Sequence, residues 1–349
     1  MAKNKSKIYL KNEFCSNENC NDYGNRDTGN IVKFGHDKNG KQRFKCKTCG
    51  GVFVETKNTI FYNRKLSEDQ IILICKLLVE KNGIRAIERI TGIHRDTISD
   101  VVKEIARHAR QVTDFLIKDI ELTEVQVDEM WSFNKKKQKN VDEGNDYADK
   151  HGDYWIYIAK KADTKLHLAH STGKRVQETA DKLMKRVKKR CKMPTDNEKA
   201  TFTSDGNSQY IGAILKNFKR NTINYGQIIK ERVKGRVISK IRKVIFGEMD
   251  VMDIDTVYIE RYNLTMRCSI SRLVRKTICF SKCSEMADNH IDLFQCYNNL
   301  NRVNSALEIE TKKGEKNIKR TPCMAEGITD HIWSWKELLM FKVGISTIY

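Results

Sequence analysis

The sequence predicts a mixed α/β domain that follows two small N-terminal modules. From about residue 122 the apolar residues alternate as they do in strands, and further along the chain they recur at helical spacing. Upstream, four cysteines, several glycines and short apolar stretches indicate a small β-rich module, which precedes a region of helical pattern. These changes divide the chain into four segments, 1–62, 63–118, 119–307 and 308–349.

A large excess of positive charge restricts the classes of partner. The 349 residues include 65 Lys+Arg against 45 Asp+Glu, a formal net charge of +20, which favours a polyanion such as nucleic acid. No apolar run approaches the ~20 residues that a membrane span requires, and the basic start of the sequence has no apolar signal core. The eleven cysteines are scattered and odd in number, which indicates reduced thiols. We therefore expect a cytoplasmic, nucleoid-associated protein with no membrane partner.

Two pairs of cysteines in residues 1–62 have the spacing of a metal site. Cys15 and Cys20 are separated by four residues, and Cys46 and Cys49 by two. Tetrahedral zinc takes four thiolates at about 2.3 Å, and Gly50 permits the tight turn that brings backbone amides to the sulfur atoms. We expect these four thiols to bind Zn²⁺, with unliganded thiols in a reducing cell as the alternative. The other seven cysteines are expected to pack in apolar surroundings.

Residues 83–100 have the layout of a helix-turn-helix. Ile84, Ile87 and Ile90 are expected to face inward on a short helix that stops at Gly92, whose freedom at positive φ suits the turn. Glu88 stands four residues before that glycine, where such motifs usually carry a small residue. The second helix would offer to DNA the side chains of Arg95, Thr97 and Ser99. A purely structural helical hairpin is the alternative.

In the region from 119 onward the order of patterns is three strands, a helix, a strand and then helices. Strands are expected near 122–128, 154–159, 166–169 and 200–204. Helices are expected near 176–191, 208–217, 256–274 and 284–303, with a basic, irregular stretch at 226–250. A short helix should follow Trp333. This order is compatible with a ribonuclease-H-like fold.

Three acidic residues in this region lie where hard metal ligands would be placed. Asp128 and Asp205 are expected at strand ends, and Glu260 on a helix that also carries Asn263 one turn on and Arg267 two turns on. Carboxylates on rigid elements can hold two Mg²⁺ or Mn²⁺ ions on either side of a scissile phosphate. Any one of these acids alone would be read as a cap or a surface charge, and the combination is the more specific signal.

Other acidic residues compete for the same roles. Glu129 adjoins Asp128, but strand alternation is expected to place it on the opposite face. The competitors of Glu260 lie in a turn-rich stretch and are Glu248, Asp250, Asp253 and Asp255. Three basic runs could follow phosphates, although an ordinary solvated face explains each of them equally well: 135–139, 182–192 and 230–243.

Several of these segments together resemble the transposases of the insertion sequence 1 family. The resemblance spans nearly the whole chain. It is carried by VDEMWS (127–132), TSDG (203–206), YGQIIK (225–230), VIFG (244–247), YIERYNLTMR (258–267), Lys282 and GITDHIW (327–333). It implies a DDE transposase with a ribonuclease-H-like core, in which Asp128, Asp205 and Glu260 match the catalytic acids and Arg267 the basic residue that follows them.

The resemblance also implies partners and a reaction. We expect the chain to bind the terminal inverted repeats of an insertion sequence and to catalyse metal-dependent cleavage and strand transfer into target DNA, as a homodimer or higher oligomer. One alternative is a DNA-binding regulator derived from an inactive transposase, and another is a metal-dependent nuclease that stops at hydrolysis.

Overall fold

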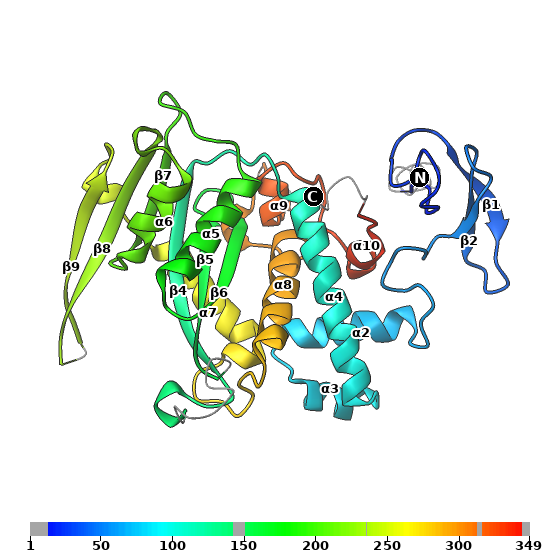
Figure 1. Ribbon diagram of the computed structural model, residues 1–349, viewed down its shortest axis with the longest axis horizontal. Helices are drawn as coiled ribbons and strands as arrows, with labels where there is room; N and C mark the ends of the chain where they lie inside the picture. The colour runs from blue at the N-terminus through cyan, green and yellow to red at the C-terminus, as the bar shows by residue number, and fades with distance from the viewer. Residues whose placement is uncertain (1–12, 142–150, 235, 313–315, 344–349) are drawn as a thin grey trace.

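The computed structural model describes residues 13–141, 151–234, 236–312 and 316–343. Within them the chain forms a three-stranded sheet, a group of helices and a six-stranded mixed sheet (Figure 1). Parts of the predicted segments 1–62, 119–307 and 308–349 lie outside the described residues.

The N-terminal module is β-rich, as predicted. Its antiparallel strands are β1 (Ile31–His36), β2 (Gln42–Cys46) and β3 (Val52–Val54). Such a small sheet can bury little apolar surface, and polar and aromatic contacts attach the module to the rest of the chain. Lys342 donates to Glu13 at 2.5 Å with both side chains buried, and the Arg26 guanidinium lies over the rings of Phe115 and Phe341.

Three helices follow the module, where helical spacing predicted them. They are α2 (Glu68–Val79), α3 (Ile84–Thr91) and α4 (Arg95–Leu116). Ser67 and Gln70 form a capping box at the start of α2. Gly92 ends α3 at a φ of 71°. Ile87 is buried as expected, but Ile90 is 57% exposed, because this helix has only eight residues and packs along a narrow stripe.

The six-stranded sheet has the strand order β6-β5-β4-β7-β8-β9. The strands are β4 (Glu124–Asn134), β5 (Gly152–Lys161), β6 (His167–Gly173), β7 (Ala200–Asp205), β8 (Ile223–Val233) and β9 (Arg236–Phe246). β4, β5 and β6 are antiparallel neighbours, whereas β7 pairs in parallel with both β4 and β8. The predicted mixed α/β class is therefore confirmed.

Strand alternation sorts the residues of β4 into two cores. Val125 and Val127 point into a cluster shared with α5 (Gln177–Arg190) and α6 (Gln209–Asn217). Met130 faces the other cluster, which is shared with α7 (Val257–Ser269), α8 (Ser284–Leu300) and the helices α2 to α4. The helices of predicted segment 63–118 thus share a core with one face of the sheet.

The region 226–250 was expected to be irregular, and this expectation is wrong. β8 and β9 form a long antiparallel hairpin there, with the pairing running from Tyr225–Phe246 to Val233–Arg236. The apolar alternation is masked because several β-branched residues of this hairpin are exposed, among them Val237 and Ile238, and basic residues stand between them. The backbone ladder and β-propensity form the strands without full burial.

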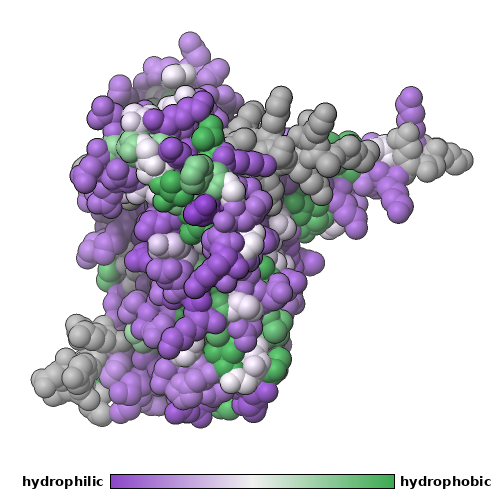
Figure 2. Space-filling view, turned by 90° about the vertical axis from the view of Figure 1, so that its right-hand side faces the viewer, coloured by the Kyte–Doolittle hydropathy of each residue, from purple (hydrophilic) through white to green (hydrophobic). Residues whose placement is uncertain are grey.

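The C-terminal part of the described chain adds two short helices. α9 (Pro322–Ala325) contacts α8, and α10 (Trp335–Met340) contacts α2 and α4. The face of the molecule seen in Figure 2 is mostly hydrophilic with small apolar patches. Within the described ranges, none of the helices combines the length and the apolar composition that crossing a bilayer would require.

Candidate active site and thiol cluster

Asp128 and Asp205 lie side by side at the point where two parallel strands stop pairing. The β4–β7 register runs from Glu124–Thr201 to Val127–Ser204, and the two aspartates are the next residues on each strand. β7 ends at Asp205, whose Oδ1 accepts the amide N–H of Asn207 at 3.1 Å. β4 does not end at Asp128 as the sequence suggested, because it continues to Asn134 against β5.

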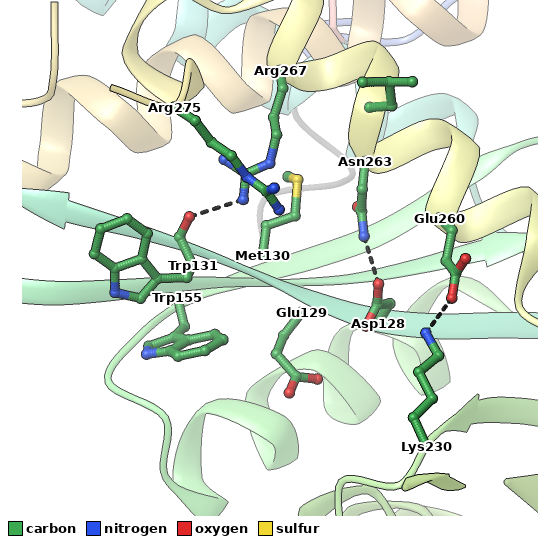
Figure 3. A pocket seen from close by; sticks show the side chains of 11 residues that line it. Asp128, Glu129, Met130, Trp131, Trp155, Lys230, Glu260, Asn263, Arg267 and Arg275 are labelled. Carbon is green, nitrogen blue, oxygen red and sulfur yellow. Dashed lines mark hydrogen bonds and ion pairs between the residues drawn. The ribbon is translucent and has the colours of Figure 1, made fainter. Parts of the chain in front are cut away.

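Glu129 joins the two aspartates. One carboxylate oxygen from each of Asp128, Glu129 and Asp205 lies within 4.8 Å of the others. Glu129 does point to the other side of β4, as alternation requires (Figure 3). Its carboxylate nevertheless reaches the aspartates because β7 ends at Asp205. No strand residue of β7 therefore lies beside Glu129 along that edge of β4. The expectation that alternation would separate Glu129 from this site is therefore wrong.

Two side chains hold Glu129 from the face covered by α5 and α6. Arg175 donates to Oε1 of Glu129 at 3.1 and 2.6 Å, and the hydroxyl of Tyr210 donates to Oε2 at 2.9 Å. Arg175 also lies over the ring of Trp155. The Glu129 side chain is only 2% exposed, so this carboxylate is fixed in orientation.

Crowding and burial perturb the two aspartates. Burial raises the pKa of Asp128 to about 8, and the negative charges of Asp205 and Glu129 contribute further. Burial likewise raises the pKa of Asp205 to about 6, followed by the charge of Glu129. A cation that binds between these carboxylates reduces their mutual repulsion and favours their ionised form. The donor set, three hard oxygen ligands, fits a divalent ion such as Mg²⁺ or Mn²⁺.

Glu260 lines the same cavity but is not a member of this cluster of three. It lies in the first turn of α7, where Lys230 of β8 donates to its Oε1 at 2.5 Å and the hydroxyl of Thr256 donates at 3.1 Å. Burial alone would raise the pKa of Glu260, but the hydrogen bond and charge of Lys230 outweigh burial and lower it. In this structure the Lys230 ammonium is thus the cation that Glu260 contacts (Figure 3).

The two other α7 residues singled out from the sequence have direct partners. The Asn263 amide donates to Oδ2 of Asp128 at 2.7 Å, which links α7 to β4. Arg267 lines the cavity, and its guanidinium donates to the backbone carbonyls of Leu273 at 2.8 Å and Trp131 at 3.0 Å. Arg275 and Lys230 line the same cavity and add to its positive charge.

The four predicted zinc ligands converge in the N-terminal module. The sulfur atoms of Cys15, Cys20, Cys46 and Cys49 lie within 4.8 Å of one another, with Cys15–Cys49 at 3.6 Å and Cys20–Cys46 at 3.9 Å. The Gly51 amide lowers the pKa of Cys49 to about 6, whereas burial raises the pKa of Cys15; the Asp22 amide donates to the Cys20 sulfur. Four soft ligands held in this way fit a tetrahedral Zn²⁺ ion.

The remaining cysteines divide into two groups. The buried ones behave as small apolar side chains and are Cys75, Cys191, Cys296 and Cys323. The exposed ones are Cys268, Cys279 and Cys283, so the expectation of apolar packing is wrong for these three. Cys268 lies near the end of α7, and Cys279 and Cys283 lie in a stretch of mostly irregular backbone that follows a short 3-10 helix.

The residues predicted to contact DNA lie at the start of α4. Arg95 and Thr97 are exposed, and the hydroxyl of Ser99 donates to the carbonyl of Arg95 at 2.9 Å. Glu88, which departs from the usual pattern of such motifs, accepts the backbone N–H of Arg95 at 3.0 Å. Its carboxylate therefore joins α3 to the N-terminus of α4 across the Gly92 turn.

Residues 245–300, which include α7 and α8, match the sequence model of the IS1 transposase family. Over this segment the chain is similar to the IS1 transposases. Insertion element iso-IS1n protein InsB of Shigella dysenteriae is 28% identical over 169 residues, which cover 48% of this chain and 91% of that protein.

Proposed function

We propose that this chain is a DDE transposase that binds the terminal inverted repeats of an insertion sequence and catalyses metal-dependent DNA cleavage and strand transfer. The observation that carries the proposal is the meeting of Asp128 and Asp205 where the parallel pairing of β4 and β7 stops, beside a cavity that Asp128 and Glu260 line. Further support comes from the order β4, β5, β6, α5, β7, which is the order expected of a ribonuclease-H-like core.

The proposed chemistry is phosphoryl transfer without a covalent enzyme intermediate. Two bound divalent ions, Mg²⁺ or Mn²⁺, would activate the attacking oxygen and stabilise the leaving oxygen. Asp128 and Asp205 would hold the ions, with Glu260 completing the set after it exchanges Lys230 for metal. Asn263 would keep the Asp128 carboxylate in one orientation, and Arg267 and Arg275 would neutralise part of the phosphate charge. Glu129, fixed by Arg175 and Tyr210 close to both aspartates, would offer a fourth carboxylate to the ions.

DNA would be brought to this site by the two N-terminal modules. In the proposal, the Cys15–Cys20–Cys46–Cys49 cluster holds a structural Zn²⁺, and the exposed start of α4 enters the major groove. The net charge of +20 supplies the sequence-independent part of the affinity. Bringing two element ends together requires at least two copies of the chain, which is why we propose a dimer or higher oligomer.

A strand-transfer assay tests the proposal. Oligonucleotides carrying the terminal inverted repeats are incubated with the chain and a target plasmid in Mg²⁺. Joined products that disappear in Asp128→Asn and Glu260→Gln, but persist in the exposed control Glu198→Gln, would support it. Hydrolysis of the ends without joining would instead identify a nuclease, and binding without either reaction would identify a regulator derived from a transposase.

A further inference from the structure

A basic hollow lies on the surface formed by α5 and α6, outside the carboxylate site. It is lined by five basic residues of α5, by Ser171 and Thr172 of β6, and by Lys216 and Asn217 of α6. The five are Lys182, Lys185, Arg186, Lys188 and Lys189. Figure 1 shows α5 and α6 next to each other on one face of the large sheet.

The charges of this hollow are not balanced locally. Lys182 pairs with Glu178 at 2.8 Å and Lys216 with Asp181 at 2.6 Å. Lys185, Lys188 and Lys189 are exposed and have no ion pair in the part of the chain that the structure describes. From residue 182 to the end of α5 there is no acidic residue.

Helix stability explains only part of this excess. Cations in the last turn of a helix are stabilised by its dipole, which accounts for Lys188, Lys189 and Arg190. Lys182 has an acidic partner one turn earlier, Glu178, whereas Lys185 and Arg186 lie further up the helix than the last turn, where the effect of the dipole has faded. An ordinary solvated helix face would carry acidic partners at a spacing of three or four residues. The excess therefore indicates an external polyanion.

The spacing of the lysines fits a nucleic-acid backbone. From Lys182 to Lys189 is seven residues, or about 10 Å along the helix axis. Successive phosphates of one DNA strand rise by about 3.4 Å, so this distance spans about three phosphates. The polar atoms of Ser, Thr, Asn and Lys side chains contact phosphates without reading sequence.

The N-terminal end of α5 points toward the carboxylate site, and the helix lies far from the predicted recognition residues. α5 begins two residues after Arg175, which binds Glu129, and Lys182 follows about 8 Å further along the axis. At its other end, Arg190 pairs with Asp114 near the end of α4. Arg95 is 19 residues before Asp114, or about 29 Å along that helix.

We propose that this hollow holds the sugar–phosphate backbone of the target duplex, while the start of α4 holds the element end. The inference rests on the proposed function, because it assigns a surface to the second DNA substrate of that reaction. Contacts here are independent of sequence, as expected for target DNA, and a duplex lying along α5 leads toward Asp128 and Asp205.

The test compares Lys185→Gln/Lys189→Gln with the matched control Lys316→Gln/Lys319→Gln, which removes two exposed lysines from a C-terminal loop. The salt dependence of binding is measured with a duplex that lacks the terminal repeat. Each lysine that neutralises a phosphate contributes about one to the slope of log K against log salt. We expect the hollow variant to lower that slope by about two and the control to leave it unchanged.

Two activity measurements complete the test. Strand transfer to a plasmid should fall by about tenfold in the hollow variant, whereas hydrolysis at the element end should be unchanged. An unchanged salt slope would overturn the inference, and so would an equal loss in both reactions. If the wild-type chain joins no DNA at all, the proposed function fails, but the salt slope still decides whether this hollow binds DNA.

Discussion

The side-chain amide of Asn263 donates a hydrogen bond of 2.7 Å to Oδ2 of Asp128, and this bond connects helix α7 to strand β4 inside the candidate active site (Figure 3). Asn263 lies one turn after Glu260, so the same helix face presents one candidate ligand and orients another. The bond leaves only Oδ1 of Asp128 free of Asn263, and it fixes the direction in which that oxygen points.

Replacing Asn263 by alanine should weaken metal binding about tenfold. Residues that orient a metal ligand typically affect affinity by about 10- to 100-fold. Isothermal titration calorimetry with Mn²⁺ measures the change in metal affinity. Leu264→Ala is the matched control, because Leu264 is the next residue on α7, lines the same cavity and has no polar side-chain atom. Equal affinities for the two variants would show that Asn263 does not position Asp128.

Replacing Glu129 by glutamine should also weaken Mn²⁺ binding by about tenfold, because it removes a carboxylate that lies within 4.8 Å of Asp128 and Asp205. Glutamine keeps the size of the side chain; its oxygen can still accept from Arg175, and its NH2 group can donate to the Tyr210 hydroxyl. Tyr210→Phe is the control, since it removes one hydrogen bond and leaves the charge. A metal affinity that is unchanged in Glu129→Gln would confine the ligand set to the three acids predicted from the sequence.

Replacing Lys230 by methionine should increase Mn²⁺ affinity. The Lys230 ammonium contacts Oε1 of Glu260 at 2.5 Å, so a metal ion that binds Glu260 must displace Lys230. Because an ion pair at a partly exposed position contributes about 0.2–1 kcal/mol, the affinity should rise by a factor on the order of two to five. Lys240→Met removes a charge that also acts on Glu260 but no hydrogen bond to it, and should give a smaller increase. Weaker binding in Lys230→Met would mean that Lys230 supports the metal site.

Some residues of this site can be predicted from the local sequence pattern, whereas others are brought to it only by contacts between distant strands. Asp205 could be found from local pattern because it ends the apolar alternation of β7, whereas Asp128 could be found from the alternation before it although β4 continues to Asn134. The four cysteines could be found from their spacing alone. Glu129 could not be assigned, because its proximity to the aspartates depends on β7 ending one residue short of it. That is a relation between strands more than 70 residues apart.

The ion pair of Lys230 with Glu260 could not be predicted from the sequence, because it too depends on a strand that the local pattern does not indicate. Residues 226–250 have too many basic side chains and too many exposed apolar ones to resemble a half-buried strand. Without β8, nothing in the sequence brings Lys230 to α7. The order of β4, β5, β6, α5 and β7 could be predicted from the sequence, because each of these elements shows the apolar periodicity of a strand or of a helix. The β8–β9 hairpin is formed by pairing between its strands.

In the absence of metal, the stability of the protein should decrease as the pH rises from about 4 to about 8. The pKa of Asp128 is raised from 3.8 to about 8, so in this range the folded state keeps a proton that the unfolded chain releases. Asp128→Asn removes most of this dependence, and the part that remains comes from Asp205, whose pKa is raised to about 6. The melting temperature of this variant in chelator should exceed that of the wild type by roughly 2–4 °C at pH 8, with a smaller difference at pH 5. Glu198→Gln should have the melting temperature of the wild type at pH 5 and at pH 8. If Asp128→Asn differs from the wild type by the same amount at both pH values, the pKa of Asp128 is not raised.

Removing zinc should unfold the N-terminal module while the large sheet stays folded. The module has only a three-stranded sheet and few buried apolar residues, so four metal–thiolate bonds would provide most of its stability. We expect one Zn²⁺ per chain by elemental analysis, none in Cys46→Ser, and normal content in Cys268→Ser, where an exposed thiol on α7 is lost. Hydrogen exchange in chelator should then accelerate in β1 to β3 but not in β4 or β7. Zinc-free protein with protected β2 amides would show that the thiols pack without a metal.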